Sequence, residues 1–181
     1  TVYFKGRDVQ PIPPHKRNFG MMFQEYALFP HKSVFGNISF GLEMLQVPPH
    51  QRDKTVQKML ELVGLSGFER RKIDDLSGGE RQRIGIARAL VLEPKFVVCD
   101  EPISALDVSV QAQVVNLLGE FRDTLGISLL FIAHDLSMVR YVSDRIIVMY
   151  LGALVEIGQS DDVFFHPKHP YTRLLIASNP E

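Results

Sequence analysis

The pattern of apolar and polar positions predicts alternating strands and helices in the second half of the chain. Residues 96–99, 129–133 and 146–149 are short, wholly apolar runs, which are typical of strands buried on both faces of a parallel sheet. Apolar residues recur at helical spacing between the first two runs, at Val110, Val114, Leu117, Leu118, Phe121 and Leu125. Strand, helix, strand, helix, strand predicts a doubly wound α/β sheet, with an edge strand at residues 153–157.

The first half of the chain gives weaker signals. Residues 2–4 are predicted as a short strand, the prolines at 11, 13 and 14 forbid regular structure up to about residue 15, and residues 19–45 favour short helices and loops. A helix is predicted over residues 51–63, where Val56, Met59, Leu60 and Val63 form one apolar stripe. Another is predicted to begin at Ser77 and to stop before Pro94.

Composition removes several classes of protein. The chain has 181 residues, enough for one domain, and its 20 basic and 21 acidic residues leave a formal charge of −1, so no nucleic-acid partner is expected. Its one cysteine, Cys99, excludes an internal disulfide and a Cys-rich zinc site. No uncharged apolar run approaches the roughly 18 to 20 residues that span a bilayer.

Polar side chains follow two of the predicted strands. Asp100 and Glu101 follow the first strand, and His134 follows the second, at the sheet edge where open parallel sheets bind ligands. A carboxylate there can hold Mg²⁺ through water, and its neighbour can act as a general base, provided that the chain turns at Pro102. The alternatives are acidic residues that cap a turn and a structural histidine.

The helix start at Ser77-Gly78-Gly79-Glu80 has two interpretations. Ser77 and Glu80 have the spacing of a capping box, which any helix can use. Residues without side chains at a helix N-terminus also let a phosphate approach unpaired backbone amides.

Five segments, in order, resemble the ATP-binding-cassette (ABC) ATPases. Residues 76–80 are similar to the family's signature motif, 97–102 to its Walker B strand, 104–107 to its D-loop, His134 to its switch histidine and Gln24 to its Q-loop glutamine. The resemblance implies a P-loop NTPase-like (RecA-like, incomplete) parallel sheet with an inserted α-helical subdomain. The expected division is a helical subdomain at 25–92, an α/β core at 93–160 and a tail at 161–181, within one partial domain.

The resemblance also implies roles for single residues in a dimeric, ATP-hydrolysing and Mg²⁺-dependent enzyme. Asp100, with Gln24, is expected to coordinate Mg²⁺, and Glu101 to act as the general base. His134 and Gln24 are expected to sense the γ-phosphate of ATP. A second subunit, identical or related, is expected to contact that phosphate through its signature residues, which are Ser77, Gly78, Gly79 and Glu80. Its D-loop carboxylate, Asp107, is expected to couple the two sites.

One departure from the family pattern is an absence. No Gly-x-x-x-x-Gly-Lys-Ser/Thr sequence is present, so the loop that cradles the phosphates is missing from these residues. We expect an N-terminal truncation and, for residues 1–181 alone, little or no ATP binding. Glu80 stands where many relatives have Gln, a variant that also suits the capping box.

The resemblance implies an importer at the cytoplasmic face of the membrane, with permease subunits and, indirectly, a solute-binding protein as partners. Residues 93–95, 104–115 and 169–175 are similar to oligopeptide and dipeptide importers, whereas residues 14–18 and 24–31 are more like importers of polyamines, iron, sulfate or sugars. Tyr26, Leu28 and Phe29 either line a groove for the membrane subunit or belong to the core. A soluble ABC ATPase acting on DNA or ribosomes and a non-catalytic remnant are the alternative interpretations.

Overall fold

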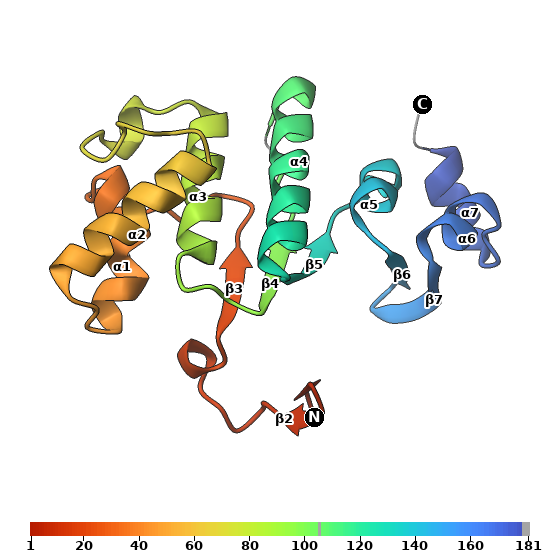
Figure 1. The fold of residues 1–181 in the computed structure, drawn as a ribbon. Helices are drawn as coiled ribbons and strands as arrows, with labels where there is room; N and C mark the ends of the chain where they lie inside the picture. The colour runs from red at the N-terminus through yellow and green to blue at the C-terminus, as the bar shows by residue number, and fades with distance from the viewer. Residues whose placement is uncertain (105, 179–181) are drawn as a thin grey trace. The chain divides into compact units, whose positions relative to one another are not determined.

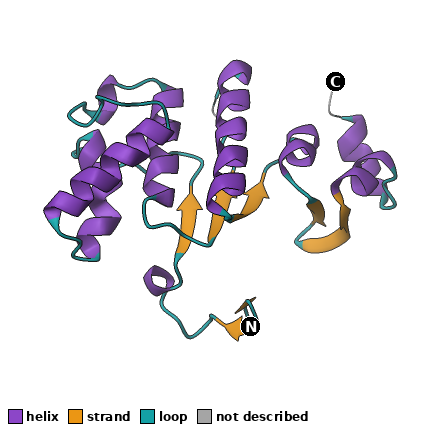
Figure 2. Ribbon diagram, in the orientation of Figure 1, coloured by secondary structure: helices purple, strands orange, loops and turns teal. Residues whose placement is uncertain are grey.

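A computed structural model describes residues 1–104 and 106–178 of the chain, which divides into two compact units, Thr1–Leu130 and Phe131–Glu181. Figure 1 traces the chain through both units, and Figure 2 shows that helices and strands occur in each of them. The mixed α/β class predicted from the sequence is confirmed. Among the described residues, no helix combines the length and the apolar character needed to cross a bilayer.

The chain starts with a short antiparallel hairpin, β1 (Tyr3–Phe4) and β2 (Arg7–Asp8). The ring of Phe4 packs edge-on against Phe19 at 5.0 Å between centroids and lies 6.1 Å from Phe96. These aromatic contacts attach the hairpin to the first residues of the central strands. A 3₁₀ turn, η1 (Pro14–Lys16), follows in the proline-rich connection.

A three-stranded sheet has the order β3-β4-β5, and its last strand spans the boundary between the two units. The strands are β3 (Phe19–Met22), β4 (Phe96–Asp100) and β5 (Ser128–Ile132), and β3 runs parallel to β4. The strands predicted near residues 96–99 and 129–133 are therefore confirmed. Strand β3 lies where short helices and loops were expected, because its sequence, Phe-Gly-Met-Met, contains no β-branched residue to mark it as a strand.

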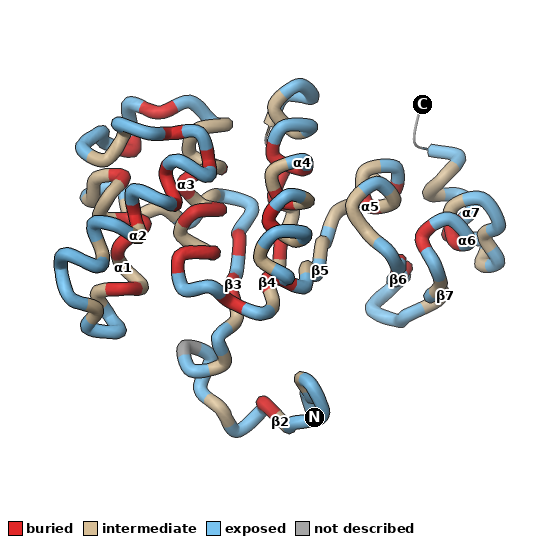
Figure 3. The backbone as a smooth tube through the Cα atoms, viewed as in Figure 1, coloured by how far each residue is buried: buried red, intermediate tan, exposed pale blue. Residues whose placement is uncertain are grey.

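Three helices, α1 (Val34–Met44), α2 (Pro49–Leu62) and α3 (Gly78–Leu90), form a group beside β3 (Figure 1). A 3₁₀ turn, η2 (Ile73–Asp75), precedes α3. The helices pack by their apolar stripes, which include the fully buried Val34, Ile38, Val56, Leu60, Ile84, Ile86 and Leu90. Figure 3 shows buried positions as red segments in α1 and α3. The helices predicted over residues 51–63 and from Ser77 onward are confirmed.

Helix α4 (Val108–Leu125) connects β4 to β5 and runs alongside β4 (Figure 1). It buries Val114, Val115, Leu118 and Phe121 on one face. The long amphipathic helix predicted between the first two strands is therefore confirmed.

The second unit contains α5 (Leu136–Val142), β6 (Arg145–Tyr150), β7 (Ala153–Gln159), α6 (Ser160–Phe165) and α7 (Pro170–Ala177). Strands β6 and β7 form their own two-stranded antiparallel sheet, so the prediction that residues 146–149 continue the parallel sheet is wrong. A tight turn accounts for the pairing of β6 with β7: Leu151 and Gly152 both have positive φ, 49° and 79°, as a two-residue hairpin requires. The core of this unit comprises Val139, Ile146, Val148 and Val163.

Candidate functional site

The site begins where two neighbouring parallel strands end. Gln24 lies two residues after β3, and Glu101 directly follows β4. The Nε2 group of Gln24 donates a hydrogen bond of 3.1 Å to Oε2 of Glu101, although 77 positions separate them in the sequence. Parallel pairing of β3 with β4 brings both strand ends to the same edge and so places the predicted Q-loop glutamine beside the predicted base.

Glu101 has an unusual backbone. Its φ is +44°, in the left-handed region that residues with a side chain seldom adopt. The carbonyl oxygen of Glu101 accepts a hydrogen bond of 3.1 Å from the hydroxyl of Ser104 and one of 3.4 Å from the backbone N–H of the same residue. The chain thus leaves the line of β4 at Glu101 itself, one residue before the turn expected at Pro102.

Asp100 is the last residue of β4 and is half-buried. The residue before it, Cys99, is fully buried, and burial raises the pKa of its thiol to about 12, which disfavours the thiolate at neutral pH. Among the described residues, no three His, Cys, Asp or Glu side chains gather into a metal-binding group. A nucleotide-bound Mg²⁺ needs only one or two protein ligands, because water and phosphate oxygens supply the rest, so the predicted pair Asp100 and Gln24 stays a prediction.

The tip of α3 carries the predicted capping box, which is confirmed. The backbone N–H of Ser77 donates to Oε2 of Glu80 at 2.7 Å, and the N–H of Glu80 donates to Oγ of Ser77 at 3.3 Å. The backbone hydrogen bond from Ser77, followed by that from its side chain, lowers the pKa of Glu80. Ser77 and Gly78 are exposed, so this helix tip is open to a ligand or to another molecule.

Gly79 has a packing role that the sequence did not indicate. A Cβ atom at this position would lie 2.7 Å from Cγ1 of Val110, closer than real Cβ atoms approach. At Gly78 the nearest atom would be the hydroxyl of Tyr26, at 3.3 Å. The second glycine of the signature thus permits close contact between α3 and the first turn of α4, whatever it does for a ligand.

The predicted D-loop, residues 104–107, lies directly before α4. Asp107 occupies the N-cap position of α4 and is exposed. The Nε2 group of Gln111 donates to the carbonyl oxygens of Ile103, at 3.2 Å, and Leu106, at 3.0 Å. Ala105, which belongs to the same predicted loop, lies outside the described residues.

His134 belongs to the second unit, two residues after β5, and is exposed. The adjacent Asp135 caps α5, since its Oδ1 accepts hydrogen bonds from the N–H groups of Ser137, at 2.9 Å, and Met138, at 3.2 Å. His134 therefore follows a strand end, as the sequence indicated, and its approach to Glu101 stays a prediction.

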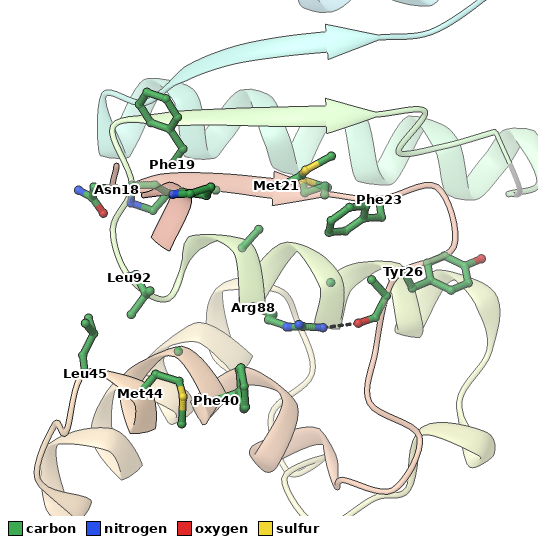
Figure 4. A pocket seen from close by; sticks show the side chains of 18 of the residues that line it. Asn18, Phe19, Met21, Phe23, Tyr26, Phe40, Met44, Leu45, Arg88 and Leu92 are labelled. Carbon is green, nitrogen blue, oxygen red and sulfur yellow. Dashed lines mark hydrogen bonds between the residues drawn. The ribbon is translucent and has the colours of Figure 1, made fainter. Parts of the chain in front are cut away.

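A groove with a volume of about 790 Å³ lies in the first unit between β3, α1 and α3 (Figure 4). Tyr26 lines it together with Phe19, Met21 and Phe23, which the sequence analysis did not single out. Of the other two predicted groove residues, Phe29 packs against the ring of Phe40 with 4.7 Å between centroids and is half-buried, as is Leu28. Tyr26 is thus the predicted groove residue that lies in the lining.

Arg88 is a charged group of this groove. Its Nη1 donates to the carbonyl oxygen of Ala27, its guanidinium lies 4.3 Å over the ring of Phe29, and burial lowers its pKa. Tyr26 and Ala27 both have positive φ, 60° and 47°. Arg88 therefore fixes a strained turn shortly after Gln24.

Comparison with known proteins gives two family matches. The family described as "ABC transporter" matches residues 1–104, and the one described as "Oligopeptide/dipeptide transporter, C-terminal region" matches residues 155–181.

Individual relatives include both kinds of importer protein, and each kind matches most of the chain. The spermidine/putrescine import ATP-binding protein PotA of Clostridium novyi is 42% identical over 98% of this chain and 51% of its own length. The oligopeptide transport ATP-binding protein OppF of Streptococcus mutans is 52% identical over 89% of this chain and 54% of its own length. The chain therefore spans about half the length of these curated relatives.

Solved structures that share the fold include one from an ABC transporter complex. It is described as "Structure of cbiO1 from clostridium perfringens: Part of the ABC transporter complex cbiONQ", and it matches with a TM-score of 0.77 at 31% identity, over 83% of this chain and 61% of that one. This likeness confirms the P-loop NTPase-like fold class that the motifs implied.

Proposed function

Because the chain belongs to the ABC transporter family, we propose that it forms part of the ATP-hydrolysing subunit of an importer. The observation that carries this proposal is the contact between Gln24 and Glu101 at the ends of β3 and β4. It joins a side-chain amide to a carboxylate at the sheet edge where parallel α/β folds bind ligands.

Within this proposal, Glu101 accepts the proton of the attacking water, and Gln24 orients its carboxylate through the 3.1 Å hydrogen bond. Asp100 and Gln24 hold Mg²⁺, which when bound neutralises charge on the phosphates. His134 and Gln24 contact the γ-phosphate. Positioning and charge stabilisation are the main requirements of phosphoryl transfer, so the proposed mechanism needs no covalent intermediate.

A second ATP-binding subunit, identical or related, completes the site in this proposal. The exposed tip of α3 supports it, because Ser77 and Gly78 are open to another molecule and a helix N-terminus favours an anion. The signature residues of one copy would face the phosphates held by the other. Asp107, exposed before α4, would link the two sites.

The groove beside β3 supports a permease partner. Its lining is mainly aromatic and apolar, and the strained turn at Tyr26 and Ala27 borders it, so a helix of a transmembrane subunit fits there. We propose that the subunit lies at the cytoplasmic face of the membrane and receives solute indirectly from a binding protein. Residues 25–92 are the proposed helical subdomain, 93–160 the core and 161–181 the tail.

Peptides are the proposed solute, and polyamines are the second candidate. The match of residues 155–181 to an oligopeptide/dipeptide transporter region and the 52% identity to an oligopeptide transport protein favour peptides. The 42% identity to a spermidine/putrescine import protein favours polyamines. Uptake assays in a strain that lacks the gene decide between them: loss of peptide uptake supports the first solute and loss of polyamine uptake the second.

ATP turnover by the full-length protein that carries this chain tests the function. Turnover stimulated by the transmembrane partner supports the proposal, whereas stimulation by DNA or ribosomes supports a soluble ABC ATPase and absent turnover supports a remnant. Residues 1–181 alone, which contain no Gly-x-x-x-x-Gly-Lys-Ser/Thr sequence, are expected to bind ATP weakly. Binding of micromolar ATP to these residues alone would contradict that expectation.

A further inference from the structure

We infer that Gln82 is a positioning residue that holds the loop carrying Glu101 in its working conformation. The inference rests on the proposed function, because it treats Glu101 as the general base. Gln82 lies on α3, two residues after the capping box, and it also belongs to the lining of the groove beside β3.

The contact that carries the inference is a buried hydrogen bond between α3 and this loop. The side chain of Gln82 is 2% exposed, and its Nε2 donates to the carbonyl oxygen of Pro102. Pro102 directly follows Glu101 and is also buried. A buried carbonyl oxygen needs a donor, and Pro102 stands in a turn rather than in a strand whose partner could supply one.

The loop needs such support because its conformation is strained. Glu101 has a φ of +44°, and a non-glycine residue stays in this region only when its surroundings hold it there. Ser104 holds the carbonyl oxygen of Glu101 from within the loop, with hydrogen bonds of 3.1 and 3.4 Å. Gln111 of α4 holds the carbonyl oxygens of Ile103 and Leu106.

Two helices therefore clamp the segment that follows β4. Gln111 fixes its later part from α4, and Gln82 fixes Pro102, the residue next to the proposed base, from α3. The 3.1 Å hydrogen bond from Gln24 to Oε2 of Glu101 depends on the position of this backbone. Loss of the bond from Gln82 would let the segment shift and would misplace the carboxylate without removing it.

The test measures ATP turnover by the full-length protein with its transmembrane partner. Gln82→Met keeps the approximate volume of the side chain and removes the donor. We expect kcat to fall about 10- to 100-fold, the effect typical of a small misplacement of a catalytic group, with KM for ATP changed by less than about threefold. Gln57→Met, at an exposed position on α2, is the matched control and should leave both parameters unchanged.

Gln82→Glu adds a readout that general loss of structure would not give. It keeps the shape of the side chain, but an ionised carboxylate cannot donate to Pro102, whereas a protonated one can. Burial raises the pKa of such a carboxyl, so the ratio of kcat for this variant to that of wild type should rise as the pH is lowered from about 8 to about 6. This ratio also decides the matter if Gln82→Met fails to fold.

The outcomes separate the two proposals. If wild type turns over ATP and Gln82→Met keeps the wild-type kcat, Gln82 does not position the base. A flat kcat ratio for Gln82→Glu across this pH range overturns the inference as well, as does an effect confined to KM. Absence of turnover in wild type overturns the proposed function, and the role of Gln82 in hydrolysis fails with it.

Discussion

The contact between Gly79 and Val110 predicts a specific cost for adding one methyl group to the signature motif. In Gly79→Ala the new Cβ would lie 2.7 Å from Cγ1 of Val110. The branched side chain of Val110 stands on the first turn of α4, where β-branched residues have one strongly preferred rotamer, so it cannot simply rotate away.

Two opposing effects set the magnitude. Forcing a methyl group into a filled contact costs about 1–3 kcal/mol, whereas replacing glycine by alanine within a helix gains about 0.5–1 kcal/mol. We therefore expect Gly79→Ala to lower the free energy of unfolding by about 1 kcal/mol. Gly119→Ala on α4 is the control, because a Cβ there meets no atom of the described residues within 4 Å, and it should be neutral or stabilising.

A double-mutant cycle in urea tests the steric explanation. In a Val110→Ala background the nearest remaining atom of residue 110 is its Cβ, 3.9 Å away, which is an ordinary contact. Without the clash, Gly79→Ala should gain the roughly 0.5–1 kcal/mol of helix preference, which gives a coupling energy of about 1–3 kcal/mol. An equal cost of Gly79→Ala in both backgrounds would refute the clash. If Gly79 also lets a phosphate approach, combining Gly79→Ala with Val110→Ala will remove the steric cost to stability but will not restore ATP turnover.

Three other substitutions should have measurable effects on stability. Burial raises the pKa of Glu156, but the side chain of Thr172 and the N–H groups of residues 168 and 169 lower it more, so the pKa lies below its ordinary value of 4.5. The ionised carboxylate therefore stabilises the fold above pH 4.5, and this stabilisation is lost as the pH falls through the lowered pKa. Glu156→Gln should therefore lower the melting temperature at neutral pH, with the difference from wild type closing below about pH 4.5 in calorimetry, and a pH-independent difference would contradict this. Arg88→Met should cost about 1–2 kcal/mol in urea unfolding, because it removes the bond to Ala27 and the stacking on Phe29, and an unchanged midpoint would show that these contacts are worth nothing. Gly152→Ala should cost about 1 kcal/mol by the same measurement, because φ is +79° there, and a gain in stability would mean that the turn rearranges.

The fold was predictable where a short-range pattern decides the structure. The apolar stripe at Val56, Met59 and Leu60 and the capping box of Ser77 with Glu80 depend on neighbours within one or two helical turns, and each occurs as expected. The pairing of residues 146–149 was predicted wrongly. An apolar run does not reveal its partner strand. The pairing of β6 with β7 depends on the positive φ values of the turn between them.

The sequence named candidate site residues but not the contacts between them. Gln24 and Glu101 were selected from motifs. The hydrogen bond between them depends on β3, a strand of four residues that was not predicted because it contains no β-branched side chain. The contacts of Gln82 and Arg88 were missed because each is a side-chain bond to a backbone carbonyl, 20 and 61 positions away in the sequence. Such bonds leave no periodic signal.

The most direct test of the proposed chemistry is the rate of ATP turnover by the full-length protein with Glu101→Gln, measured beside wild type in the presence of the membrane partner. The substituted amide cannot accept the proton of the attacking water, so turnover should fall about 100-fold or more while ATP still binds. Turnover close to the wild-type rate would show that the strand end at Glu101 does not supply the base.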